Sequence, residues 1–395
     1  MESTVRSARL RLALVVWGVL VSQVFLYPGL SDLVVALGAP GGIQAGMWFL
    51  VAEFAAFVTF AGIWGVVSDV TGKRVPWVVA GAVGGVACYL LLTQLPSLGL
   101  GWGAVLVVRL VGGALTIGAF SLAITMLMDL SGGHGRNMGA AGIAIGLGAA
   151  LGSVVGGQLS TLGPLTPLYA SAAVLLSAGL LAATVPDRTP TKSPGVGTIL
   201  DRLRERPSLG VPYAFGFIDR STAGFFSLVG VYYFRDVFDL DAAMAGLTLA
   251  CFFLPFALLQ YPFGSLSDRI GRFLPVVGGS VVYGLTIVAV GVAPVYPLAA
   301  AAMAAAGVCG ALMAPATMAL VTDLARPDER GAAMGGFNVF GSVGFLAGVL
   351  VGGSVASQYG FFTAFLVTGG IEICVAALAI PFFLRWERRR TGVSA

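Results

Sequence analysis

Charged residues inside otherwise apolar stretches are the first candidates for chemistry in this sequence. Glu53 and Arg109 each lie within a long apolar run, and Asp219 lies close to the start of another. A charge in hydrocarbon costs several kcal/mol, so each residue is expected to have a partner or to face water. Desolvation favours a neutral carboxyl group and a nearby arginine favours its charged form, so such a pair could exchange a proton. Proton exchange and a purely structural ion pair are therefore the two interpretations of Glu53 and Arg109.

The depth of these residues in the membrane indicates whether they can meet. At a rise of about 1.5 Å per residue, Glu53 lies about 24 Å from Asp69 at the end of the same run. By the same rise, Arg109 lies about 30 Å from Asp129. The difference of about 6 Å is within reach of two long side chains, so a pair is predicted if the helices are neighbours. Asp219 is the alternative proton-carrying carboxylate.

The composition is that of an integral membrane protein. Hydrophobic residues make up 57% of the 395 residues and charged residues only 10%, whereas soluble domains average about a quarter charged. Runs of about 20 apolar residues can cross a bilayer as helices. The sequence predicts an all-α membrane protein with twelve such helices, near residues 12–30, 45–67, 76–94, 103–128, 138–159, 166–185, 211–234, 243–264, 274–293, 297–322, 332–354 and 361–384.

The basic residues predict the orientation of these helices. Arg109 and Arg220 lie inside helices, and every other basic residue except Arg235 falls on the side that carries the N-terminus. Basic residues concentrate in cytoplasmic loops, so we expect both termini in the cytoplasm and the protein in the plasma membrane.

Several function classes are disfavoured by what the sequence lacks. It contains no Gly-x-x-x-x-Gly-Lys-Ser/Thr loop for ATP, and its one histidine and four scattered cysteines form no metal or nucleophile pattern. A membrane enzyme, a cofactor, a metal site and a nucleic-acid partner are therefore not expected. The expected partners are a small-molecule substrate, protons and the lipid bilayer, and the chain is expected to be monomeric.

Two short loops divide the chain into equivalent halves. Each has glycine, then aspartate, then glycine and a base, and their glycines allow a tight connection between two helices. The loops are Gly65, Asp69, Gly72, Lys73 and Arg74, and then Gly264, Asp268, Arg269, Gly271 and Arg272. We expect an N-terminal six-helix bundle at 1–185, a cytoplasmic linker at 186–210 and a C-terminal six-helix bundle at 211–395.

This pattern resembles the loop motif of the major facilitator superfamily, which falls between helices 2 and 3 and again between helices 8 and 9. The resemblance covers nearly the whole chain and is closest to the twelve-helix drug:proton antiporters. It implies two pseudo-symmetric bundles that rock around a central site. It also implies an inner gate in which Lys73 pairs with Asp129 and Arg272 pairs with Asp323. The first loop departs from the family pattern at Val70, where an arginine is usual.

Two further motifs carry the resemblance. Arg109–Gly113 resembles the helix 4 motif of proton-coupled members, which implies that Arg109 influences proton movement. Small residues at four-residue spacing let helices approach closely. They occur in helices 5 and 11 at Gly148, Gly152, Gly156, Gly157, Gly344, Gly348, Gly352 and Gly353. The helix 5 version resembles the antiporter motif, with Ser153 in place of the expected proline. Ordinary close packing is the alternative interpretation.

Polar and aromatic residues predict a substrate cavity. An aromatic-lined cavity suits flat or apolar compounds. The candidate residues are Gln23 and Tyr27, expected on one face of helix 1, together with Arg220, Phe225, Phe226 and Asn338. Glu372 lies in helix 12, which is peripheral in the family, and is interpreted as structural or adjacent to lipid.

Three functions are compatible with these residues. The leading hypothesis is proton-driven export of small, mostly apolar compounds. The second is a proton-coupled symporter for an organic anion or metabolite, to which Arg109 and Arg220 would supply positive charge. The third is a non-transporting membrane sensor or scaffold, which the intact gate motifs in both halves disfavour.

Overall fold

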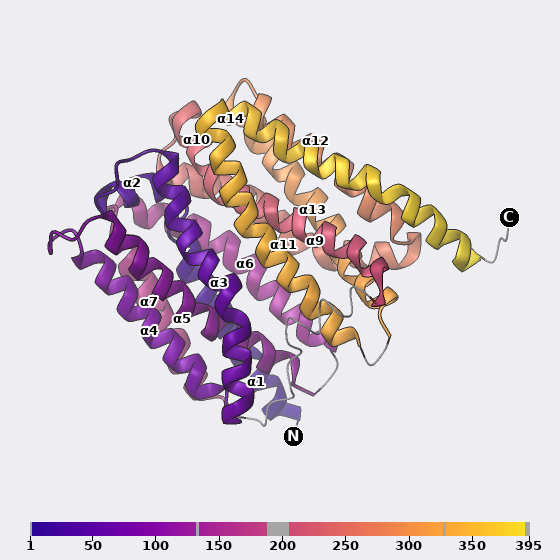
Figure 1. The fold of residues 1–395 in the computed structure, drawn as a ribbon, viewed down its shortest axis with the longest axis horizontal. Helices are drawn as coiled ribbons and strands as arrows, with labels where there is room; N and C mark the ends of the chain where they lie inside the picture. The colour runs from indigo at the N-terminus through magenta and orange to yellow at the C-terminus, as the bar shows by residue number, and fades with distance from the viewer. Residues whose placement is uncertain (1, 132–133, 188–204, 327–328, 392–395) are drawn as a thin grey trace. The chain divides into compact units, whose positions relative to one another are not determined.

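The apolar runs of the sequence form helices, because a chain in lipid must satisfy its backbone hydrogen bonds within itself. The computed structural model describes residues 2–131, 134–187, 205–326 and 329–391, and within these ranges it contains helices and no strand (Figure 1). Ten of the described helices are long and apolar enough to cross a membrane. The predicted all-α membrane fold is therefore confirmed.

The helices of the first half end close to the predicted boundaries. They are α1 (Glu2–Val24), α2 (Leu30–Ala36), α3 (Ile43–Thr71), α4 (Val75–Gln94), α5 (Trp102–Met128), α6 (His134–Thr161) and α7 (Thr166–Ala183). The prediction for helix 1 was wrong at its end, because α1 stops at Val24 and Tyr27 lies in a turn before Pro28 and α2. Gln23 and Tyr27 therefore do not share a helix face.

The second half contains two interrupted helices. Its elements are η1 (Pro207–Leu209), α9 (Gly210–Phe225), η2 (Phe226–Gly230), α10 (Val231–Phe238), α11 (Ala242–Ile270), η3 (Leu274–Gly278), α12 (Gly279–Val292), α13 (Tyr296–Leu324) and α14 (Arg330–Thr391). A π-helical turn, η2, separates α9 from α10 within the predicted seventh span. Gly360, at φ 84° and ψ 167°, divides α14 into two arms that correspond to the last two predicted spans. Each of the twelve predicted segments thus has a helical counterpart among the described residues.

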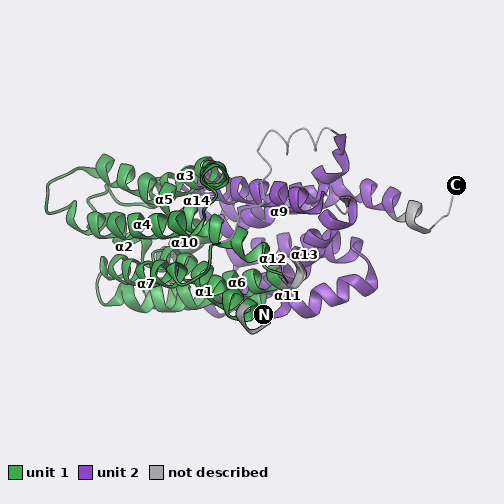
Figure 2. Cartoon of the chain, turned by 90° about the horizontal axis from the view of Figure 1, so that it is seen from below, with its two compact units in different colours: residues 1–193, 226–257 green, residues 194–225, 258–395 purple. Residues whose placement is uncertain are grey.

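The chain forms two compact units (Figure 2). Unit 1 comprises residues 1–193 and 226–257, and unit 2 comprises residues 194–225 and 258–395. In unit 1, α5 packs against α3 and α4, and α1 packs against α6 and α7. In unit 2, α14 packs against α9 and α12. The predicted bundles at 1–185 and 211–395 stay a prediction, because units grouped by packing and halves related by a repeat are different divisions. Most of the predicted linker, 188–204, lies outside the described residues.

Glycines bring specific helix pairs into close contact in both units. A Cβ added at Gly156 of α6 would lie 2.6 Å from Cα of Phe25, and one added at Gly157 would lie 2.6 Å from the carbonyl oxygen of Ala242. Gly148 and Gly152 face α1 in the same way. In unit 2, a Cβ at Gly344 or Gly348 would collide with backbone carbonyl groups of α9.

The remaining residues of the two glycine motifs are also enclosed. Gly352 and Gly353 are buried. Ser153, which replaces the expected proline, donates a hydrogen bond of 2.7 Å to the carbonyl oxygen of Ala149 within α6. The helix 5 motif therefore packs closely without a proline.

Candidate functional site

The predicted pair of Glu53 and Arg109 is present in unit 1. Both side chains are buried, and Nη2 of Arg109 donates to Oε2 of Glu53. The guanidinium group also lies 4.5 Å from the ring centroid of Phe49 and 5.8 Å from that of Tyr89. A cation over an aromatic face is stabilised by the ring quadrupole, so the rings hold Arg109 beside the carboxylate.

A glycine one turn after Arg109 brings the two helices together. A Cβ added at Gly113 would lie 2.6 Å from the carbonyl oxygen of Glu53 and 2.9 Å from its Cα. The backbone of α5 therefore contacts α3 at the residue that carries the acid. In the Arg-x-x-x-Gly spacing, the arginine is the base, and the glycine lets the two helices come close enough for Arg109 to reach Glu53.

Two buried polar atoms of this pair, Oε1 of Glu53 and Nε of Arg109, have no hydrogen-bond partner among the described residues. The same is true of Nε2 of Gln23 on α1. Tyr27 is buried and close enough to Glu53 and Arg109 to interact electrostatically with both. A small pocket lined by Arg109, Tyr89 and Thr116 adjoins the pair. A buried polar atom without a hydrogen-bond partner raises the free energy of the protein. Binding of water, a proton or a polar group of a ligand at these atoms would therefore be favourable.

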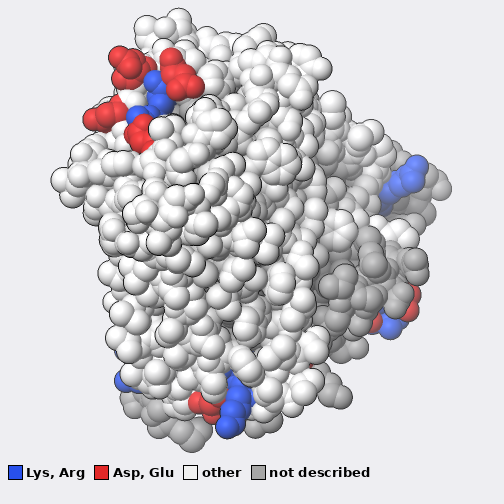
Figure 3. Space-filling view, turned by 60° about the vertical axis from the view of Figure 1, so that its left-hand side comes forward, with Lys and Arg blue, Asp and Glu red and all other residues white. Residues whose placement is uncertain are grey.

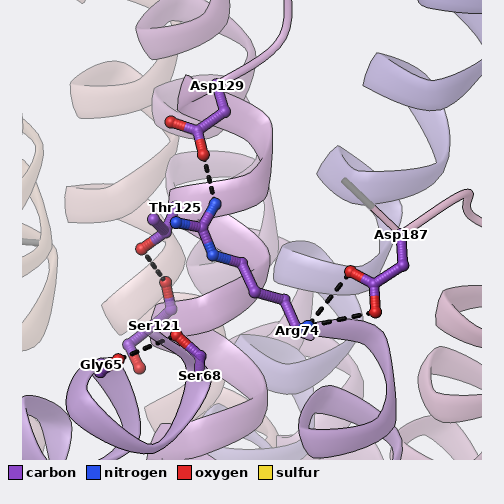
Figure 4. A network of polar contacts seen from close by, with 7 residues as sticks. All are labelled: Gly65, Ser68, Arg74, Ser121, Thr125, Asp129 and Asp187. Carbon is purple, nitrogen blue, oxygen red and sulfur yellow. Dashed lines mark hydrogen bonds and ion pairs between the residues drawn. The ribbon is translucent and has the colours of Figure 1, made fainter. Parts of the chain in front are cut away.

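The first inner loop pairs Asp129 with Arg74 and not with Lys73, so the predicted Lys73–Asp129 pair was wrong (Figure 4). The left-handed Gly72, at φ 63°, ends α3 and turns the chain. Arg74 is then 1% exposed, whereas Lys73 is exposed. Adjacent residues in a turn point in different directions, and here the second base faces the protein.

Asp187 fixes the backbone of this loop. The N–H group of Arg74 donates to both carboxylate oxygens of Asp187, at 3.1 and 3.2 Å. The carboxylate thereby lies at the N-terminus of α4, where negative charge is favourable. This contact was not predicted from the sequence, although an acidic residue just after a membrane helix was a usable signal. Asp69 lies on α3, two residues before its end, and is half-buried. Gly65 accepts a hydrogen bond from the Ser68 hydroxyl at 2.9 Å.

The second inner loop contains the predicted Arg272–Asp323 pair. Nε of Arg272 lies 3.0 Å from Oδ2 of Asp323, and Nη1 lies 2.7 Å from Oδ1 of Asp268. Partial burial acts to lower the pKa of Arg272, but the hydrogen bonds and charges of the two aspartates raise it overall. Gly271, at φ 89°, supplies the left-handed turn. Arg269 is exposed, and Gly264 is half-buried.

The structure does not test a shared cavity for the other predicted substrate residues. Phe225 contacts Phe365 edge to face in unit 2, at 5.0 Å, and Phe226 contacts Phe252 in unit 1, at 5.8 Å. Both phenylalanines are buried by protein. Asn338 is exposed.

Asp219 and Arg220 form no ion pair among the described residues, as expected for adjacent positions on a helix. Both side chains are half-buried, on α9 of unit 2. Asp219 interacts electrostatically with Arg220. Asp219 remains the alternative proton carrier.

An outer ion pair was not predicted. Nη1 of Arg235, on α10, lies 2.7 Å from Oδ2 of Asp32, on α2. The Tyr232 hydroxyl donates to the carbonyl oxygen of Gly42 at 3.3 Å. This pair was missed because helix 1 was predicted to continue to residue 30, so the short helix α2, which carries Asp32, was not recognised. On the face in Figure 3, charged side chains gather at the upper left, at the bottom and along the right-hand edge, and the broad area between them is uncharged.

Comparison with known proteins shows which family and which transport proteins this chain is similar to. Residues 213–394 match the family model of the Major Facilitator Superfamily. The chain is 28% identical to the class G tetracycline resistance protein of Vibrio anguillarum over 74% of this chain and 76% of that protein. It is 30% identical to multidrug resistance protein MdtG of Serratia proteamaculans over 35% of this chain and 33% of that protein.

Solved structures share the fold at low sequence identity. The human organic anion transporter TETRAN is 20% identical, with a TM-score of 0.71 and coverage of 95% of this chain and 99% of that one. The nucleoside transporter NupG is 16% identical, with a TM-score of 0.77 and coverage of 95% and 100%. These matches relate residues 213–394 to the Major Facilitator Superfamily, and the chain shares the fold of solved transporters of low sequence identity.

Proposed function

We propose that this transporter exports small apolar compounds in exchange for protons, and that Glu53 carries the proton. The observation that carries the proposal is the buried Glu53–Arg109 pair, in which Oε1 of Glu53 has no hydrogen-bond partner among the described residues. The names of the tetracycline and multidrug resistance relatives support export of drug-like compounds. The low identity of these relatives leaves the substrate to experiment.

The coupling follows from the chemistry of the pair. Arg109 beside Glu53 favours the carboxylate, and withdrawal of Arg109 leaves the carboxyl group in apolar surroundings that favour the protonated form. A movement of Arg109 between the two access states would therefore load and unload the proton. The rings of Phe49 and Tyr89 lie beside the guanidinium group, at 4.5 and 5.8 Å, and stabilise its charge where it meets Glu53.

Proton-driven transport in proteoliposomes tests this proposal. Glu53→Gln should abolish uphill transport driven by a pH gradient and leave downhill exchange largely intact, because Gln keeps the shape and cannot cycle a proton. Arg109→Ala should reduce transport further than Glu53→Gln, because it leaves the buried carboxylate of Glu53 without its partner. If Glu53→Gln still concentrates substrate with a normal pH dependence, Glu53 is structural, and Asp219→Asn is the next variant to measure.

An organic-anion symporter is the second candidate. The half-buried Arg220 has no hydrogen bond or ion pair among the described residues, and could therefore bind an anion. The charge of Arg109 is already balanced by Glu53, which weakens the anion hypothesis. Substrates of similar size and different charge separate the two candidates, since an anion symporter accumulates only anions and moves them together with protons.

The cellular setting forms part of the same proposal. The distribution of basic residues favours cytoplasmic termini and a plasma-membrane location, and the chain is proposed to act as a monomer. Substrate flux in proteoliposomes would also exclude the sensor or scaffold hypothesis.

A further inference from the structure

Unit 2 contains a second buried carboxylate, which the proposed coupling does not use. Glu372 lies on the second arm of α14 and is 1% exposed. The Ser280 hydroxyl on α12 donates to Oε1 of Glu372. Oε2 makes no hydrogen bond within the described residues, and none of their ion pairs includes Glu372. The carboxylate thus has one hydrogen-bond donor and lacks a cation.

The position of Glu372 is imposed by close helix packing. A Cβ added at Gly284 of α12 would lie 3.2 Å from Cβ of Glu372 and 2.6 Å from the carbonyl oxygen of Gly369. A Cβ added at Gly369 would likewise lie 2.5 Å from the carbonyl oxygen of Gly284. These two glycines bring α12 and α14 together, so Glu372 has little freedom to swing out to the membrane surface.

Glu372 lines a pocket formed within unit 2 by α9 and the two arms of α14. Most of the lining is aliphatic, and the hydroxyl groups of Ser221, Thr222 and Thr368 add weak polarity. No lysine or arginine lines the pocket. Asp219 on α9 lies close enough to Glu372 to interact electrostatically, and Tyr283 on α12 interacts with both acids. Among the described residues, Glu372 is thus the charged residue that lines the pocket, and Asp219, with which it interacts, is also acidic.

The pocket borders an exposed apolar surface. Val351 on the first arm of α14 and Ile371 on the second arm line the pocket and are 47% and 45% exposed. Both lie in a segment long and apolar enough to cross the membrane. A compound dissolved in the bilayer could therefore reach Glu372 between apolar side chains without crossing water.

We propose that this pocket binds a lipophilic amine from the bilayer, with the protonated nitrogen paired to Oε2 of Glu372. An ammonium group supplies both the missing hydrogen-bond donor and the missing charge, and a charge-assisted hydrogen bond is among the stronger polar contacts. An anion would meet the carboxylate of Glu372. Among the described residues, no group of three acidic, histidine or cysteine side chains could hold a metal ion. The inference names a substrate class, so it rests on the proposed export function.

Binding of a fluorescent amine to the purified full chain tests the site. The probe is dansylcadaverine, the matched neutral probe is N-acetyl-dansylcadaverine, and nanodiscs of phosphatidylcholine provide a bilayer without net charge. The unmodified protein should bind the amine at least tenfold more tightly than the acetylated compound. Glu372→Gln should reduce this preference to less than threefold, while Asp239→Asn, at an exposed acid, leaves it unchanged. A tenfold preference that survives in Glu372→Gln overturns the proposal.

Two tryptophan variants locate the site if Glu372→Gln does not fold. Ile371→Trp fills the entrance and should weaken the binding of both probes at least fivefold. Leu378→Trp, at a residue 80% exposed on the same arm, should weaken the binding of neither probe. Amine binding unaffected by Ile371→Trp overturns the proposal. Proton-driven flux in the same preparations separates the two ideas. Glu372-dependent binding without export removes the proposed function alone, and export with Glu372-independent binding removes the site alone.

Discussion

At the scale of single residues, the adjacent bases Lys73 and Arg74 differ in burial and in pairing. Arg74 is buried against Asp129, while Lys73, one position earlier, is exposed. Helical rise relates the depth of Glu53 to that of Arg109, which is why their pair could be predicted from the sequence. No such rule applies at a helix end, because a single left-handed glycine decides which of two adjacent side chains turns inward.

Arg74→Ala and Lys73→Ala form a matched pair of variants for the first inner loop. Arg74→Ala should destabilise the protein by about 1 to 3 kcal/mol, less than a fully buried pair, because Asp129 is partly exposed. It should also increase labelling of cysteines placed at the inner ends of α3 and α5. Lys73→Ala should change neither quantity. Thermal unfolding and maleimide labelling measure both effects, and equal behaviour of the two variants would contradict the assignment of Arg74.

The second inner loop should be insensitive to alkaline pH. A base with a raised pKa contributes its stabilisation fully below its unfolded pKa and loses it only as the pH rises through the higher folded value. For Arg272 the unfolded pKa already lies well above this alkaline range, and the aspartates raise the folded pKa further. Labelling of a cysteine beside Asp323, divided by that of an exposed reference cysteine whose thiol ionises in the same range, should therefore stay constant between about pH 8 and 10. An Arg272→Lys variant is the comparison, because a lysine titrates near the top of this range. A labelling ratio that rises with pH in the unmodified protein would show that another group controls the loop.

At the scale of helices, glycines decide which elements meet. Gly113 contacts the backbone of α3 at Glu53, whereas a Cβ at the adjacent Gly112 would lie 3.2 Å from Cβ of Cys88. The four-residue glycine spacing made close packing predictable, but it did not say which helix would be the partner. That choice depends on the tertiary arrangement, as does the burial of Phe225 and Phe226 in separate clusters.

Gly113→Ala and Gly112→Ala test this close approach. The methyl group at residue 113 meets backbone and should push α5 from α3, with a cost of about 1 to 3 kcal/mol and a loss of proton-driven flux. The methyl group at residue 112 meets a side chain that can shift, so it should cost less. Unfolding temperature and flux in proteoliposomes provide the measurements. A larger effect from Gly112→Ala would argue against the role given to Gly113.

At the scale of the whole molecule, the hydrophobic composition of the chain and the distribution of its charges predicted the helical fold and its spans. They could not predict the outer pair of Asp32 and Arg235, because a proline-containing turn ends α1 early and creates α2. Nor could they predict that residues 226–257 pack with residues 1–193 in unit 1. Such grouping depends on the conformational state of the molecule, and hydropathy contains no information on state.

The outer pair should control access from outside the membrane. Arg235→Asp should separate α10 from α2 through like-charge repulsion and increase cysteine labelling at the outer end of α3. Asp32→Arg combined with Arg235→Asp should restore the unmodified labelling, because the swapped charges attract again. If the double variant labels as strongly as Arg235→Asp alone, the pair has no part in closure.

The π-helical turn η2 sets the rotational phase of the seventh helix. It begins at Phe226, the residue at which the chain passes from unit 2 to unit 1. One residue changes the direction of every later side chain by about 100° on a helix. If residues 226–230 formed an ordinary α-helix without the loss of a residue, the later part of the helix would rotate by about 100° and Arg235 would turn away from Asp32. The π-helical turn therefore keeps α9 and α10, the two ends of one helix, each directed towards its own neighbours.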